Sequence, residues 1–73
     1  MYPGYDLALG ENNDYVKYVQ EKLALFFNNP NILREQGYFG PLTLLHVLMF
    51  QHVFDMLETG VVDETTWKKL TEV

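Results

Sequence analysis

The sequence predicts an all-α fold, a compact three-helix bundle with short connecting turns. Apolar residues recur at spacings of three and four over residues 16–26, which places them on one face of a helix. Residues 41–57 are apolar nearly all round, and a third, shorter helical segment follows Asp63. No segment shows a convincing apolar–polar alternation of the kind typical of strands. We therefore expect one domain over residues 1–73, with residues 1–11 as an irregular lead-in.

Composition limits how such a domain is stabilised and what it binds. A chain of 73 residues without cysteine must rely on packing, and 48% hydrophobic residues make this feasible. The net charge of −5 argues against nucleic acid and anionic membrane surfaces as partners. No stretch approaches the roughly 20 apolar residues of a membrane span, so membrane insertion is not expected.

The first helix is expected to begin after Asn12 or Asn13, because either side chain can cap it. Its buried face should consist of Val16, Val19, Leu23 and Phe26. The sequence Asn28–Pro30 should end this helix. A short helical turn then follows, with Asn29 as its cap and Pro30 in its first position.

The second helix is expected to begin at Pro41 and to end at Thr59 and Gly60. Because it is apolar nearly all round, we expect it to be the buried central element of the bundle. The third helix should be capped by Asp63 and should direct Trp67 and Leu70 inward.

A weak internal repeat relates the two glycine-containing turns. Gly37, Phe39, Thr43 and Val47 match Gly60, Val62, Thr66 and Leu70, each 23 positions later (60 − 37 = 23). In each copy a glycine closes the preceding element, and the apolar residue two positions on enters the core. Phe39 is therefore expected in the core. Tyr38 falls on the other side of the turn, and the sequence favours neither core packing nor ligand contact for its side chain.

Three motifs follow one another between Leu9 and Leu70: V-K-Y-V-Q-E-K-L at 16–23, G-Y-F-G-P-L-T at 37–43 with F-Q at 50–51, and G-V-V-D-E-T-T-W at 60–67. This ordered set resembles the small three-helix peptidoglycan-binding domain that accompanies many bacterial and phage cell-wall hydrolases. The resemblance implies a non-catalytic module that binds peptidoglycan or a muropeptide and targets an attached or associated hydrolase to the wall.

The alternative function is a protein–protein interaction or regulatory module on the same scaffold, such as a phage structural adaptor or a pro-domain. The acidic balance and the run of tyrosines favour this alternative.

The resemblance also implies a location in the cell wall or outside the cell. The first ten residues lack the basic segment and long apolar stretch of a signal peptide. We therefore expect either a phage-released protein or a fragment of a longer one, while a cytoplasmic location stays open.

The residue types favour a protein without a catalytic, metal or cofactor site. Serine and cysteine are absent, and His46 and His52 lack the i, i+4 spacing of a helical zinc pair. One partly buried and one surface histidine are expected. Asp63, Glu64 and the other acidic residues near helix starts are explained by capping. The chain is predicted not to be an enzyme.

The candidate ligand-binding site lies at the turn from Gly37 to Thr43. Its expected residues are Gln20, Gln36, Gly37, Tyr38, Gly40, Leu42, Thr43 and Gln51. The two glutamines should mainly hold loop backbone, because buried amides need hydrogen-bond partners. Gly40 has no side chain with which to cap the second helix, so we expect the N–H groups of Leu42 and Thr43 to receive a ligand carboxylate.

Overall fold

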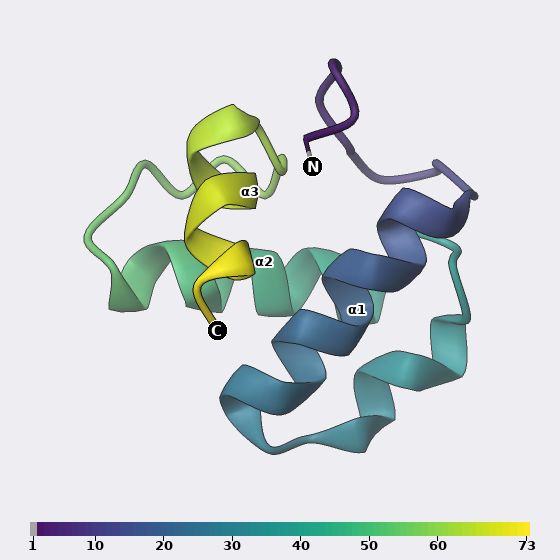
Figure 1. Ribbon diagram of the computed structural model, residues 1–73. Coiled ribbons are helices and arrows are strands. Elements are labelled where there is room, and N and C mark those ends of the chain that lie inside the picture. The colour runs from purple at the N-terminus through teal and green to yellow at the C-terminus, as the bar shows by residue number, and fades with distance from the viewer. Residues whose placement is uncertain (1) are drawn as a thin grey trace.

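The computed structural model describes residues 2–73, which form three α-helices and one 3-10 helix (Figure 1). In chain order these are α1 (Asp14–Phe27), η1 (Pro30–Glu35), α2 (Pro41–Val53) and α3 (Glu64–Thr71). The all-α prediction is confirmed, since within residues 2–73 no strand forms beyond two isolated bridges. None of the helices in this part of the chain is long and apolar enough to cross a membrane.

The ends of α1 and η1 agree with the sequence. The Asn13 side chain accepts a 2.9 Å hydrogen bond from the backbone N–H of Val16 and so caps α1. Asn28 follows the helix in the left-handed conformation, with φ of 51°. The Asn29 side chain then caps η1 by accepting a 3.1 Å bond from Asn31.

The end of α2 was predicted wrongly. The helix stops at Val53 rather than at Thr59 and Gly60. Asp55 adopts a left-handed conformation with φ of 56°, and the Met56 N–H donates to the carbonyl of Gln51 at 2.8 Å. This is the Schellman pattern of a helix C-terminus. Glycine usually occupies this left-handed position. Because the chain has aspartate there, the sequence gives no signal that the helix ends at Val53.

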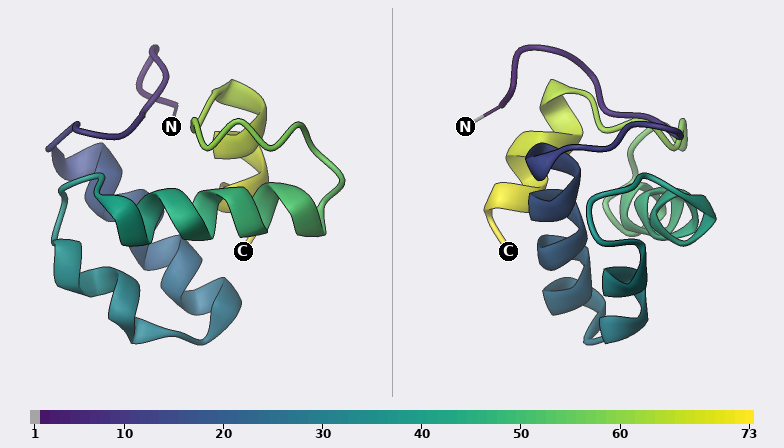
Figure 2. Two further views of the ribbon diagram at one scale, coloured as in Figure 1. Left: turned by 180° about the vertical axis from the view of Figure 1, so that it is seen from behind. Right: turned by 90° about the vertical axis from the view of Figure 1, so that its right-hand side faces the viewer.

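The expectation that α2 is buried and central is also wrong. α1 is the element that packs against η1, α2 and α3 (Figures 1 and 2). α2 buries one side only, because no other element within residues 2–73 covers its other side. Leu45, Met49 and Val53 lie four residues apart on the outer side and are 51%, 40% and 55% exposed. We call these three residues the α2 stripe.

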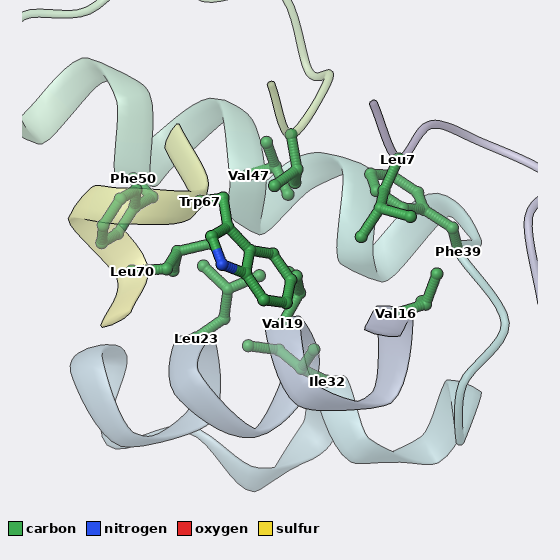
Figure 3. Packing of buried hydrophobic residues seen from close by; sticks show 11 residues of the cluster. Leu7, Val16, Val19, Leu23, Ile32, Phe39, Val47, Phe50, Trp67 and Leu70 are labelled. Atoms are coloured by element: carbon green, nitrogen blue, oxygen red, sulfur yellow. The ribbon is translucent and has the colours of Figure 1, made fainter. Parts of the chain in front are cut away.

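The core lies between the three α-helices and is closed by the connecting segments (Figure 3). Its members are Leu7, Val16, Val19, Leu23, Ile32, Phe39, Val47, Phe50, Val62, Trp67 and Leu70. The predictions for Phe39 and Trp67 are confirmed, at 0% and 3% exposure. Phe26 and Phe54 are only partly buried and pack against the edge of this cluster.

Candidate functional site

The Gly37–Thr43 turn is held in place by the buried side chain of Gln20 on α1. The Gln20 Nε2 group donates to the carbonyl of Tyr38 at 2.8 Å and to the Thr43 hydroxyl at 2.9 Å. Its Oε1 atom accepts from the backbone N–H of Gly37 at 2.7 Å. One fully buried amide thus ties together both ends of the turn, as the sequence led us to expect.

Gln51 makes the same set of bonds in the second copy of the repeat. Its Nε2 group donates to the carbonyl of Val61 at 2.9 Å and to the Thr66 hydroxyl at 3.2 Å. Its Oε1 atom accepts from the N–H of Gly60 at 3.0 Å. The internal repeat is therefore a repeated hydrogen-bond arrangement, and Gln51 builds the second turn rather than the first.

The lead-in joins the two turns. Leu7 and Val62 exchange backbone hydrogen bonds of 3.0 and 2.8 Å. Three residues later, the Gly10 N–H donates to the Phe39 carbonyl at 2.8 Å, and the Phe39 N–H donates to the backbone carbonyl of Glu11 at 2.7 Å. The segment before α1 thus pairs in turn with the core residue of each copy, and Figure 2 shows it running from beside the start of α3 to the start of α1.

Glu35, at the end of η1, caps α2 from outside the turn. Its Oε2 atom accepts from the Leu42 N–H at 2.9 Å. Its Oε1 atom accepts from the Thr43 N–H at 2.8 Å, the Thr43 hydroxyl at 2.6 Å and the Gly40 N–H at 3.2 Å. The expectation that these N–H groups receive a ligand carboxylate is therefore wrong, because a carboxylate of the chain itself already occupies that position.

Gly40 is required by this cap. A Cβ atom built on Gly40 would lie 2.8 Å from the carboxylate carbon of Glu35 and 2.9 Å from Cε2 of Tyr38. The backbone of Gly40, with φ of −103°, is one that other residues also adopt. Glycine is needed here for close approach of the Glu35 side chain, and not for an unusual backbone angle.

The cap also changes the acidity of Glu35. Partial burial raises the pKa of this carboxyl, but hydrogen bonds from the Thr43 hydroxyl and from the N–H groups of Leu42, Thr43 and Gly40 lower it. The hydrogen bonds prevail, and the pKa of Glu35 lies below its ordinary value. Glu35 is thus a charged structural group at neutral pH.

Three of the predicted site residues reach the surface. Gln36 is exposed in a left-handed conformation with φ of 46°, Tyr38 is 43% exposed, and Leu42 is half-buried. The others are buried, namely Gln20, Gly37, Gly40, Thr43 and Gln51. Gln20, Gly37, Gly40 and Thr43 make the buried hydrogen bonds that fix the Gly37–Thr43 turn.

His46 lies behind the same turn and is 6% exposed, whereas His52 is on the surface. The carbonyl of Leu42 lies 2.7 Å from Nδ1 of His46, and the amide of Asn29 lies 3.4 Å from Nε2. Because a carbonyl only accepts, Nδ1 carries the proton and Nε2 accepts from Asn29. His46 therefore joins η1 to α2, and no group of three metal-binding side chains forms within residues 2–73.

Sequence reasoning missed Glu35. The available signal was that a helix preceded by Gly40 needs an acceptor from elsewhere, and Glu35 is the nearest preceding carboxylate. Local patterns do not reveal such a contact, since Glu35 lies eight positions before Thr43.

Residues 12–70 match the model of the peptidoglycan binding domain family. The chain belongs to this family, and the expected resemblance is confirmed. Peptidoglycan is accordingly the indicated ligand and the cell wall the indicated place of action. No curated protein matches the chain.

Proposed function

We propose that the chain is a non-catalytic module that holds the peptide stem of peptidoglycan at the Gly37–Thr43 turn and so concentrates an attached or associated hydrolase at the wall. The observation that carries this proposal is the way Tyr38 is presented. Its side chain is 43% exposed, while its carbonyl is bound by Gln20 and its N–H donates to the carbonyl of Glu35 at 2.9 Å. An exposed aromatic residue on a fixed backbone contacts a ligand at little entropic cost.

Within this proposal the site residues fall into two groups. Gln36, Tyr38 and Leu42 contact the ligand directly, because they are the ones at the surface. Gln20, Gly37, Gly40 and Thr43 position the turn, and Gln51 does the same for the second turn. We also propose that residues 1–73 act as one domain, which is supported by the bonds of Leu7, Gly10 and Glu11 to the two turns.

The charge of Glu35 decides which part of the stem this turn accepts. The ionised carboxylate holds the start of α2, so a stem carboxylate would meet a like charge there. Stem peptides also carry amide groups and, in their diamino acid, an amino group. We propose that these groups, and not the carboxylates, face the turn.

Co-sedimentation with purified peptidoglycan sacculi tests the function. Wild-type protein should pellet with sacculi, and Tyr38→Ala should pellet less at the same concentration. Leu25→Ala is the matched control, because it truncates an exposed apolar residue of α1, 69% exposed, and should pellet like wild type. If wild type pellets no more than an unrelated domain of equal charge, the function is wrong.

The alternative function, a protein-interaction module, is favoured by the α2 stripe. Leu45, Met49 and Val53 are exposed on a helix that contains no acidic residue, lysine or arginine. A hollow beside the stripe is lined by Phe27, Leu48, Met49, His52, Val53 and Glu58. Because this helix face carries no charge, the partner that we propose for it is a second copy of the chain. Concentration-dependent self-association that Met49→Lys abolishes, without sacculus binding, would favour this alternative.

A further inference from the structure

Three of the five tyrosines pack around Trp67, where the lead-in meets α1 and α3, and a fourth packs against one of these three. The Trp67 ring lies 5.0 Å from that of Tyr18, 6.3 Å from that of Tyr15 and 6.4 Å from that of Tyr2, between ring centroids. Tyr5 extends the cluster, with its ring 6.3 Å from that of Tyr15. We call these four tyrosines the aromatic corner.

Packing accounts for only part of the aromatic corner. Tyr2 and Tyr18 are partly buried and cover Trp67, which is 3% exposed. Tyr5 and Tyr15 are 46% and 44% exposed. The planes of these two rings are almost perpendicular, at 88°, so the edge of one ring packs against the face of the other.

The polar groups at this corner favour an uncharged ligand. The Tyr2 hydroxyl donates to the Asp6 carboxylate at 2.8 Å, and the Asn13 amide lies 3.5 Å from the Tyr5 hydroxyl. The hydrogen bond to Asp6, the partial loss of solvent, and the negative charges of Asp6, Glu64 and Asp63 together raise the pKa of Tyr2 to about 12. These carboxylates repel an anionic ligand beside Tyr2, while the Lys22 ammonium lies 5.6 Å from the ring centroid of Tyr18. Hydroxyl and acetamido groups find both donors and acceptors at the corner.

The corner is also continuous with the Gly37–Thr43 turn. Asn13 reaches the Tyr5 hydroxyl with its side chain, and its backbone N–H donates to the carbonyl of Gly37 at 3.1 Å. The neighbouring Asn12 forms an antiparallel bridge with Tyr38. A ligand with two different parts could therefore contact both places at once.

We infer that the aromatic corner binds the glycan strand of peptidoglycan, with N-acetylated sugar rings against Tyr5 and Tyr15, the two exposed members of the corner. This inference rests on the proposed function and adds to it, because it assigns the glycan to the corner and the peptide stem to the turn. Sugar rings present C–H groups to an aromatic face and hydroxyl groups to its polar rim, which a tyrosine pair can match. In the sugar that bears the peptide stem, the acid group is joined to the stem by an amide bond, so this sugar carries no charge at that position.

Titration with N-acetylchitotetraose, a neutral oligomer of N-acetylglucosamine, tests the inference. Amide resonances of Tyr5 and Tyr15 should shift, and the fluorescence of Trp67, the single tryptophan, should change. Tyr5→Ala should weaken the affinity about 3- to 10-fold, the range expected for one aromatic contact. Leu25→Ala, exposed on the same helix as Tyr15, should bind like wild type. Tyr5→Leu keeps an apolar side chain without a ring and should lose affinity as Tyr5→Ala does.

The sacculus assay separates the two ideas. If wild type binds sacculi but Tyr5→Ala and Tyr5→Leu bind equally well, the inference is overturned and the proposed function stands. Shifts from free stem peptide, and none from the oligosaccharide, at the aromatic corner would overturn the inference in the same way. If wild type does not bind sacculi, the proposed function fails and the inference fails with it.

Discussion

The carboxylate of Glu35 lies 2.8 Å from the backbone nitrogen of Thr43 and 2.6 Å from its hydroxyl oxygen. This contact joins η1 to the first turn of α2 and takes the role that the Asp63 side chain has in α3, where it accepts from Thr66 at 2.8 Å. The two copies of the repeat are thus capped by the same chemistry from different places in the chain.

Glu35→Ala should destabilise the domain, because it leaves the N–H groups of Gly40, Leu42 and Thr43 without their acceptor. We expect the free energy of unfolding to fall by about 1–3 kcal/mol in urea denaturation. Glu21→Ala, at an exposed position of α1, is the control and should change it by less than about 0.5 kcal/mol. Equal effects of the two substitutions would mean that the cap contributes nothing.

Stability should depend on pH through the same carboxylate. Its pKa in the folded chain is below the ordinary value of 4.5, so ionised Glu35 stabilises the fold above that value. This contribution is lost as the pH falls from about 4.5 through the lower folded pKa. Wild type should therefore lose more unfolding free energy than Glu35→Gln between neutral pH and about pH 3. Parallel losses in the two proteins would contradict this account.

Gly40→Ala tests the close approach of the glutamate. The new methyl group would displace the Glu35 side chain and weaken its four hydrogen bonds, at a cost of about 1–3 kcal/mol. In a Glu35→Ala background the same substitution should cost less, since the contact with the glutamate is gone and only the close contact with the Tyr38 ring remains. A double-mutant cycle by urea denaturation measures this coupling. Additive effects would show that the methyl group does not disturb the cap.

Trp67 and Tyr38 should separate core from site. Trp67→Ala removes a side chain that is 3% exposed and should cost about 3–5 kcal/mol. Tyr38→Ala removes a side chain that is 43% exposed and should cost less than about 1 kcal/mol while reducing sacculus binding. Thermal unfolding checks both variants. If Tyr38→Ala lowers the melting temperature as much as Trp67→Ala does, Tyr38 is a packing residue.

Local patterns predicted the elements whose signals lie within a few residues. Asn13, Asn29 and Asp63 cap helices by contacts to residues two or three positions on, so their roles are readable in sequence. The repeat of glycine and threonine predicted the two turns, and the need of a buried amide for partners predicted that Gln20 and Gln51 hold loop backbone.

Two features depended on tertiary contacts and could not be predicted. The cap of α2 comes from Glu35, which reaches Thr43 only because η1 folds back beside the start of α2. The exposure of Leu45 and Met49 follows from the small number of elements, since nothing in residues 2–73 covers the outer side of α2. An apolar composition alone does not say which faces of a helix find neighbours.

The most direct test of the central claim is an amide chemical-shift map of the wild-type domain saturated with soluble muropeptides released from sacculi. The account predicts shifts at Gln36, Tyr38 and Leu42, the surface residues of the Gly37–Thr43 turn. Gly60 and Val61, in the second turn, serve as internal controls and should stay unchanged. Absence of shifts at the first turn, or shifts confined to the α2 stripe, would contradict the claim that this turn holds peptidoglycan.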